Sequence, residues 1–176
     1  ENYFISALDL LCIADTNGNF KRVNKEWENV LGYSVDDLEN KKFLDFIHPD
    51  DLPETLEVIQ HLSEQESVLN FTNRYKCKDG SYRYIEWRSI PRGELIFAAA
   101  RDVTDRKKSE EAVKESEEKY RALFEQSVEG IYLHDLYGNI VDVNNIACQQ
   151  CGYSREELSL MTVFDLHLEK EIDKKI

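Results

Sequence analysis

Positive charge is scarce in this sequence, and so are long apolar runs. The 176 residues contain 22 Lys and Arg against 35 Asp and Glu, which gives a formal net charge of −13 at pH 7. A surface of that sign repels phosphate backbones and acidic lipids, so neither nucleic acid nor direct membrane contact is expected. The longest apolar runs, such as residues 95–100, are far shorter than the roughly 20 residues that cross a bilayer.

Cysteine is sparse as well. Cys12, Cys77, Cys148 and Cys151 do not form the dense framework of a disulfide-stabilised secreted domain, so we expect reduced thiols in the cytoplasm. Cys148 and Cys151 form a Cys-Gln-Gln-Cys motif, but the sequence has no second pair of Cys or His residues at zinc-ligand spacing. We therefore predict no metal and interpret both cysteines as ordinary helix positions. The chain begins with Glu1 instead of Met, from which we expect a fragment of a longer protein.

Recognisable catalytic patterns are missing from the sequence. It has no Ser-His-Asp, Cys-His or phosphate-binding glycine pattern, and no phospho-acceptor His-Glu box of a histidine kinase. The paired acids Asp50 and Asp51 are explained as helix caps, with a capping box between Asp51 and Glu54. We therefore predict a non-catalytic chain without catalytic residues.

Turn signals divide the first 104 residues into two groups of strands around a block of helices. Asn-Gly at residues 17–18 and Asp-Gly at residues 79–80 are typical hairpin turns. The predicted strands are residues 11–14, 20–23, 68–78, 81–91 and 94–103. Because both groups must bury an apolar face, they are expected to share one mostly antiparallel sheet with helices on one face, an α+β fold.

The helices between the strands are predicted from capping residues and the 3.6-residue period. Asn24 is expected to cap a helix that ends before Gly32. A longer helix is expected from about residue 51 to residue 64. The residues expected on its inward face are Leu52, Leu56, Ile59 and Leu62.

The composition changes after Val103 to charged, helix-favouring residues without Gly or Pro. In this segment Val113, Ser116, Tyr120 and Leu123 are spaced three, four and three residues apart, the phase of a coiled coil. We predict a homodimer formed through the preceding domain and this helix, which substitutions of Val113 and Tyr120 should weaken. A single solvated spacer helix is the alternative.

The sequence repeats itself with a shift of 120 residues. Residues 15–24, DTNGNFKRVN, return as DLYGNIVDVN at residues 135–144, and Gly-Tyr-Ser occurs at both 32–34 and 152–154. Ten identities fall between Asp15 and Asp45 without a gap, and they are Asp15/Asp135, Gly18/Gly138, Asn19/Asn139, Val23/Val143, Asn24/Asn144, Gly32/Gly152, Tyr33/Tyr153, Ser34/Ser154, Leu38/Leu158 and Asp45/Asp165. They fall on turn glycines, cap residues and apolar sites, so the repeat indicates two tandem domains.

Several ordered motifs resemble a PAS domain of the S-box type, which occurs in tandem in microbial sensor histidine kinases and diguanylate cyclases. They are GNFKRVNKEWENVLGYSVDDL, FLDFIHPDD, RYKCKDGSYRYIEWRSIP and AARDVTDRK, and the resemblance covers residues 4–106. A second resemblance covers residues 121–176 and stops after the middle helices.

The resemblance implies a PAS fold, with a five-stranded antiparallel sheet, helices on one face and a C-terminal linker helix. The expected organisation is a PAS sensory domain at 1–104, a helical signalling linker at 105–120 and an incomplete second PAS domain at 121–176. Without its last three strands, the second domain is expected either to be disordered or to borrow a strand edge from a neighbouring chain.

The resemblance also implies a sensory module that perceives a small ligand or partner and signals through its linker to a kinase domain in the same chain. Asp102-Val103-Thr104 matches the family's Asp-x-Thr motif, which anchors the exit helix. The predicted signal relay consists of Asp102, Thr104, Val113 and Tyr120. The alternatives are a ligand-free dimerisation scaffold and a sensor for a diguanylate cyclase.

Bulky side chains and two alanines are the candidates for a ligand pocket. They are Trp27, Phe43, Phe46, Ile47, Ile59, Leu62, Phe71, Tyr75, Trp87, Ala98 and Ala100. The cofactor is left open: residues 34–51 lack the flavin-binding cysteine motif, and His61 lies too late on its helix to match the family's haem ligand. A fully packed core is the alternative. Arg74, Arg83 and Arg88 would pair with an anionic ligand or remain solvated.

Overall fold

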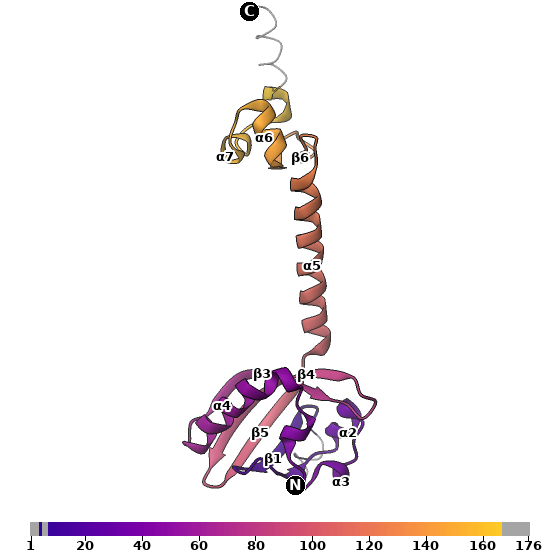
Figure 1. Cartoon of the computed structure of the whole chain (residues 1–176), viewed down its shortest axis with the longest axis vertical. Helices are drawn as coiled ribbons and strands as arrows, with labels where there is room; N and C mark the ends of the chain where they lie inside the picture. Colours follow the sequence, from indigo (N-terminus) through magenta and orange to yellow (C-terminus); the bar gives the residue numbers. More distant parts are fainter. Residues whose placement is uncertain (1–3, 5–6, 167–176) are drawn as a thin grey trace, which may run out of the picture. The chain divides into compact units, whose positions relative to one another are not determined.

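The computed structural model describes residue 4 and residues 7–166. The chain divides into two units, Glu1–Ser109 and Glu110–Ile176, which we call the first and the second domain. Helix α5 (Thr104–Gln126) contributes residues to both (Figure 1). None of the helices in the described part of the chain is both long enough and apolar enough to cross a membrane.

The first domain contains one antiparallel sheet of five strands, in the order β2-β1-β5-β4-β3. The strands are β1 (Leu10–Asp15), β2 (Phe20–Val23), β3 (Val68–Lys76), β4 (Tyr82–Arg92) and β5 (Leu95–Asp102). β1 pairs with β5, so the hairpin from the start of the domain joins the three strands from its end. The predicted α+β fold with a five-stranded antiparallel sheet is confirmed.

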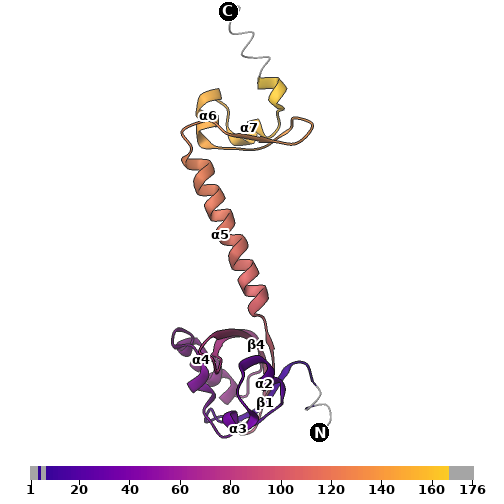
Figure 2. The ribbon, with the colours of Figure 1, turned by 90° about the vertical axis from the view of Figure 1, so that its right-hand side faces the viewer.

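Short helices and one longer helix connect β2 to β3. They are α2 (Glu26–Leu31), α3 (Val35–Leu38), the 3-10 turns η1 (Phe43–Phe46) and η2 (Pro49–Asp51), and α4 (Leu52–Ser63). α4 contacts β3 and β4, whereas α2 contacts β1 and α3 contacts β2 (Figures 1 and 2). The core lies between these helices and the sheet.

The alternation of side chains along the strands decides which residues enter the core. On β5, Ile96, Ala98 and Ala100 are buried, whereas Leu95 and Phe97 are exposed on the opposite face. The main core consists of Leu10, Cys12, Ala14, Phe20, Val23, Trp27, Leu31, Leu38, Phe43, Ile47, Tyr75, Cys77, Ile85, Trp87, Ala98 and Ala100.

The predicted cap at Asn24 is wrong. α2 begins after Lys25 and has no side-chain cap. The buried Asn24 amide instead accepts a hydrogen bond from the Leu11 backbone N–H at 2.9 Å and donates one to the Asp9 carbonyl at 3.0 Å. Buried backbone groups need partners, and here the asparagine supplies them to the start of β1.

The predicted capping box at Asp51 and the predicted inward position of Leu56 on α4 are also wrong, whereas Leu62 is buried and Leu52 and Ile59 pack against the core as predicted. Asp51 makes no side-chain cap, because its carboxylate binds Arg74 on β3. Leu56 is 52% exposed, and the neighbouring Thr55 is buried in its place. The Thr55 hydroxyl is tolerated inside because it donates to the Asp51 carbonyl at 2.7 Å.

After the C-terminal part of α5, the second domain contains a hairpin and two short helices. They are β6 (Tyr132–His134), β7 (Ile140–Val143), α6 (Asn145–Cys151) and α7 (Arg155–Leu158). Its hydrophobic core cluster consists of Ile140, Val143, Ala147 and Leu158. The first alternative, a disordered second domain, therefore does not hold for the described residues 121–166. The second alternative, that the domain borrows a strand edge from a neighbouring chain, stays a prediction. The last residues of the second resemblance, 167–176, lie outside the described residues.

The two domains share local conformations at repeated positions. Gly32 and Gly152 both end a helix in the left-handed conformation, with φ of 79° and 80°, a region that favours glycine. Ser34 and Ser154 both form a capping box at the next helix. The sequence repeat therefore corresponds to a repeat of backbone structure.

Asp15 closes the turn between β1 and β2. Its carboxylate accepts hydrogen bonds from the backbone N–H groups of Asn17 and Asn19, and it pairs with Lys21 at 2.9 Å. Burial acts to raise the pKa of Asp15, but the hydrogen bonds from Lys21 and Asn19 and the Lys21 charge outweigh it and lower the pKa to about 2.

We expect the Asp15 carboxylate to make the stability of the first domain depend on pH. A carboxyl group whose pKa is lower in the folded state stabilises the fold above its unfolded pKa of about 3.9 and loses that effect as the pH falls toward 2. The stability difference between wild type and Asp15→Asn should therefore shrink from pH 5 to pH 2.5, as measured by urea unfolding. The exposed Asp36 provides the control variant Asp36→Asn. A difference for Asp15→Asn that is constant over this range would contradict the expectation.

Candidate functional site

A small cavity of about 50 Å³ lies in the core of the first domain, between α4 and the sheet. α4 contributes Thr55, Val58, Ile59 and Leu62, and the strands and η1 contribute the remaining lining. The remaining lining residues are Cys12, Ala14, Phe20, Phe43, Phe71, Asn73, Tyr75, Trp87, Ser89, Ile96 and Ala98. The space exists partly because Ala14 and Ala98 stand where larger side chains would fill it.

A chain of hydrogen bonds crosses the cavity wall from β4 to α4. The Trp87 indole N–H donates to the Asn73 carbonyl oxygen at 2.7 Å, and the Asn73 amide donates to the Thr55 hydroxyl oxygen at 3.1 Å. All three side chains are buried. Because buried polar groups are costly when unpaired, a change at any one of them affects the strand and the helix together.

Two further polar groups line the cavity without a hydrogen bond to another residue in the described part of the chain. They are the hydroxyls of Tyr75 and Ser89, and both residues are buried. Burial raises the pKa of Tyr75 well above its ordinary value and raises the pKa of the Cys12 thiol to about 12. Both groups are therefore neutral at pH 7, and the cavity is lined only by uncharged side chains.

The structure brings together most of the residues predicted to form a pocket. Those that line the cavity are Phe43, Ile59, Leu62, Phe71, Tyr75, Trp87 and Ala98. Those that lie elsewhere, in or against the core, are Trp27, Phe46, Ile47 and Ala100. The polar lining residues Thr55, Asn73 and Ser89 could not be predicted, because apolar periodicity gives no signal for polar residues that are buried in the fold.

The arginines considered for an anionic ligand do not line the cavity. Arg74 pairs with Asp51 at 2.5 Å, and Arg83 pairs with Asp102 at 3.3 Å. Arg88 is exposed. His61, considered for haem, is also exposed and lies 2.7 Å from a carboxylate oxygen of Glu66. None of these groups offers a charge to a molecule inside the cavity.

The junction between β5 and α5 is held by side-chain hydrogen bonds. The carboxylate of Asp102 accepts from the backbone N–H and from the hydroxyl of Thr104. The Thr104 hydroxyl oxygen accepts in turn from the Tyr84 backbone N–H at 2.9 Å. The Val103 backbone N–H donates to the Tyr84 carbonyl at 2.9 Å, so the first residues of α5 are tied to β4.

Two ion pairs on β4 strengthen this junction. Arg83 pairs with Asp102, and Glu86 pairs with Arg106 of α5 at 2.7 Å. Trp87 and Ser89, which line the cavity, belong to the same strand. β4 therefore connects the cavity wall directly to the start of α5.

Comparison with known proteins places both domains in one family. A family model described as "PAS fold" matches residues 20–95, and one described as "PAS domain" matches residues 118–175. The chain belongs to the PAS family. Among curated proteins, it is 27% identical over 166 residues to sporulation kinase E of Bacillus subtilis (strain 168). That match covers 91% of this chain and 22% of the kinase, so the chain spans about a fifth of its relative.

Solved PAS structures share the fold of the first domain. A sensory box histidine kinase/response regulator from Burkholderia thailandensis E264 has a TM-score of 0.57 at 25% identity, covering 66% of this chain and 93% of that one. The PAS domain of a protein from Colwellia psychrerythraea has a TM-score of 0.54 at 24% identity, covering 59% of this chain and 93% of that one.

The exit helix of the first PAS domain leaves its predicted dimer seam uncovered. Val113, Tyr120 and Leu123 are 60%, 45% and 76% exposed in the single chain. Such side chains become buried when two helices pair in coiled-coil phase. Homodimerisation through α5 stays a prediction.

Proposed function

We propose that the first PAS domain is a cytoplasmic sensor that binds a small uncharged molecule in its cavity and signals through α5 to a histidine kinase domain. The observation that carries this proposal is the position of β4. Trp87 and Ser89 of this strand line the cavity, while Arg83 pairs with Asp102 at the end of β5 and Glu86 pairs with Arg106 of α5. A ligand that displaces the strand therefore displaces the anchor of the helix.

The size and chemistry of the cavity limit the ligand. Typical ligand pockets have about 300–1,000 Å³, whereas this cavity has about 50 Å³, enough for only a few non-hydrogen atoms. A charged molecule would be buried without a counter-charge, which is unfavourable. The hydroxyls of Tyr75 and Ser89 offer hydrogen bonds to a neutral polar group.

The kinase output and the homodimer belong to the same proposal. The relative named as a sporulation kinase supports a kinase as the downstream partner, since the match covers most of this chain. The exposed Val113, Tyr120 and Leu123 support a dimer through α5. In this proposal the chain itself contributes sensing and not catalysis, and nucleic acid is not a partner.

Native mass spectrometry with a cavity-filling variant tests the sensor. We expect wild-type protein to retain a small molecule that is lost on denaturation, and Ala98→Val to retain none, because the added methyl groups occupy the cavity. Ala99→Val is the matched control, since Ala99 points to the opposite face of β5. Equal masses for folded and denatured wild type would contradict the sensor and favour a ligand-free interaction scaffold.

A further inference from the structure

We infer that the second PAS domain holds the C-terminal end of α5 through Asn144 and a cluster of four charged side chains, and is therefore the receiver of any movement of this helix. The helix end is not simply solvated. Within the last turns of α5, Phe124 is 5% exposed, whereas its neighbour Leu123 is 76% exposed. One face of the helix end is thus packed into the second domain.

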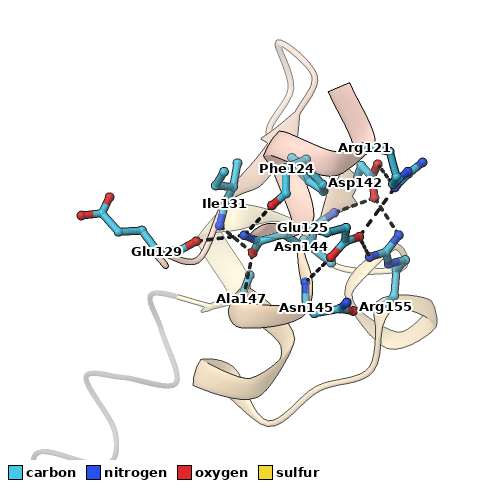
Figure 3. A network of polar contacts seen from close by, with 11 residues as sticks. Arg121, Phe124, Glu125, Glu129, Ile131, Asp142, Asn144, Asn145, Ala147 and Arg155 are labelled. Carbon is cyan, nitrogen blue, oxygen red and sulfur yellow. Dashed lines mark hydrogen bonds and ion pairs between the residues drawn. The ribbon is translucent and has the colours of Figure 1, made fainter. Parts of the chain in front are cut away.

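Asn144 binds the backbone at this point (Figure 3). Its side-chain amide donates to the carbonyls of Phe124, at 3.0 Å, and Glu129, at 2.9 Å. Its oxygen accepts from the backbone N–H groups of Ile131 and Ala147, both at 2.9 Å. An asparagine side chain has two donor hydrogens and two acceptor lone pairs, so this buried amide is fully used. One residue thereby joins the end of α5 to Ile131, which precedes β6, and to α6.

A charge cluster, which we define as Arg121, Glu125, Asp142 and Arg155, lies beside Asn144 (Figure 3). Arg155 is 2.6 Å from Glu125 and 3.5 Å from Asp142, while Arg121 is 3.2 Å from Asp142 and 3.8 Å from Glu125. Each cation therefore touches both anions, which fixes the rotation of α5 about its axis. Glu125 also accepts from the Asn145 backbone N–H at 2.9 Å.

The sequence repeat indicates which part of this arrangement is special to the second domain. Asn24, the counterpart of Asn144, makes the equivalent bonds to Leu11 and Asp9. The counterparts of the charge cluster, by a shift of 120 residues, are Glu1, Ile5, Arg22 and Val35. No position keeps its charge, so the cluster is not a shared requirement of the repeated fold. It is an addition that binds the second domain to its helix.

The charge cluster lies away from the predicted dimer seam. At about 100° per residue, Arg121 and Glu125 lie about 140° around the helix from the centre of the seam formed by Val113, Ser116, Tyr120 and Leu123. The charge cluster and a second copy of α5 would therefore contact different faces of the helix, whereas Phe124 stacks on the seam residue Tyr120 with ring centroids 5.2 Å apart. A rotation of α5 at this end moves the second domain with it, because the backbone itself is held.

Hydrogen exchange of the intact chain tests the inference. In Asn144→Asp the donors to Phe124 and Glu129 are lost, but the acceptor oxygens for Ile131 and Ala147 remain. We expect amide exchange of residues 121–126 to rise by on the order of tenfold. Asn24→Asp, which makes the same change in the first domain, should leave this segment unaffected. Unchanged exchange in Asn144→Asp would overturn the inference.

A milder variant serves if Asn144→Asp unfolds the second domain, which would appear as lost protection over residues 131–158. Glu125→Gln keeps the shape of the side chain and removes its charge. Exchange of residues 121–126 should then rise by a few fold at low salt, and wild type should approach the variant near 1 M salt. Identical exchange of wild type and Glu125→Gln at low salt would overturn the role of the charge cluster. Both readouts are independent of any ligand, so they can fail without affecting the cavity proposal.

Discussion

Replacement of Trp27 by alanine is expected to lower the free energy of unfolding of the first PAS domain by about 3–5 kcal/mol. The side chain is fully buried, and its ring lies 5.1 Å from Phe20 and 5.8 Å from Trp87, measured between ring centroids. Its indole N–H donates to the Leu11 carbonyl at 3.1 Å. The substitution therefore leaves a large cavity and also removes the partner of a strand carbonyl.

Urea unfolding followed by tryptophan fluorescence measures this loss. The only other tryptophan is Trp87, which also lies in the first domain, so the signal does not report the second domain. Glu118→Ala, at an exposed position of α5 outside the predicted dimer seam, is the control and should change the free energy by less than about 0.5 kcal/mol. A loss of less than about 1 kcal/mol for Trp27→Ala would mean that the core does not depend on this ring.

The sheet could be predicted because its signals are local. Asn17-Gly18 and Asp79-Gly80 mark turns that few other residues allow, and the repeat places the same turn at Gly138. Alternation along β5 then assigns Ala98 and Ala100 to the same face. Such features depend on neighbours in the sequence, which can be read without knowing the fold.

The polar interior could not be predicted, because its partners are distant in the sequence. Thr55 is buried in place of Leu56, because its hydroxyl oxygen accepts a hydrogen bond from the side-chain amide of Asn73, which is 18 residues away in the sequence. Asn24 likewise hydrogen-bonds a residue that is distant in the sequence: its side chain binds the backbone of Leu11 in β1 and does not cap the helix that follows it. The cavity is also a result of packing: a pair of alanines in the sequence is equally consistent with a filled core.

Asp102 and Thr104, in contrast, could be identified from the sequence through the resemblance to PAS domains. The structure adds the contacts that these two residues make. The motif alone suggests a helix cap. The additional contacts are the Tyr84 backbone N–H and the ion pairs of Arg83 and Glu86, all from β4. The helix is therefore attached to β4 as well as to β5, the strand that it follows, and both strands line the cavity.

Thr104→Val is expected to loosen the start of α5 while the first PAS domain stays folded. Thr104 is buried, and its hydroxyl both donates to Asp102 and accepts from the Tyr84 backbone N–H. Valine keeps the shape but leaves the Tyr84 N–H without that acceptor, a loss of about 1–3 kcal/mol. Because about 1.4 kcal/mol corresponds to a factor of ten in an equilibrium, exchange of the amides of residues 104–108 should rise by about ten- to a hundredfold.

The matched control for this prediction is Thr72→Val, the same chemical change on β3 away from the junction, which should leave residues 104–108 unaffected. Tryptophan fluorescence should show both variants folded. If Thr104→Val exchanged like wild type at residues 104–108, the hydroxyl would not hold the helix to β4. The anchor would then consist of the Val103–Tyr84 backbone hydrogen bond and the ion pairs alone. Since Tyr84, Arg83 and Glu86 all belong to β4, the strand would still connect the cavity to α5, but through one backbone hydrogen bond and two ion pairs, and the ion pairs weaken as salt increases.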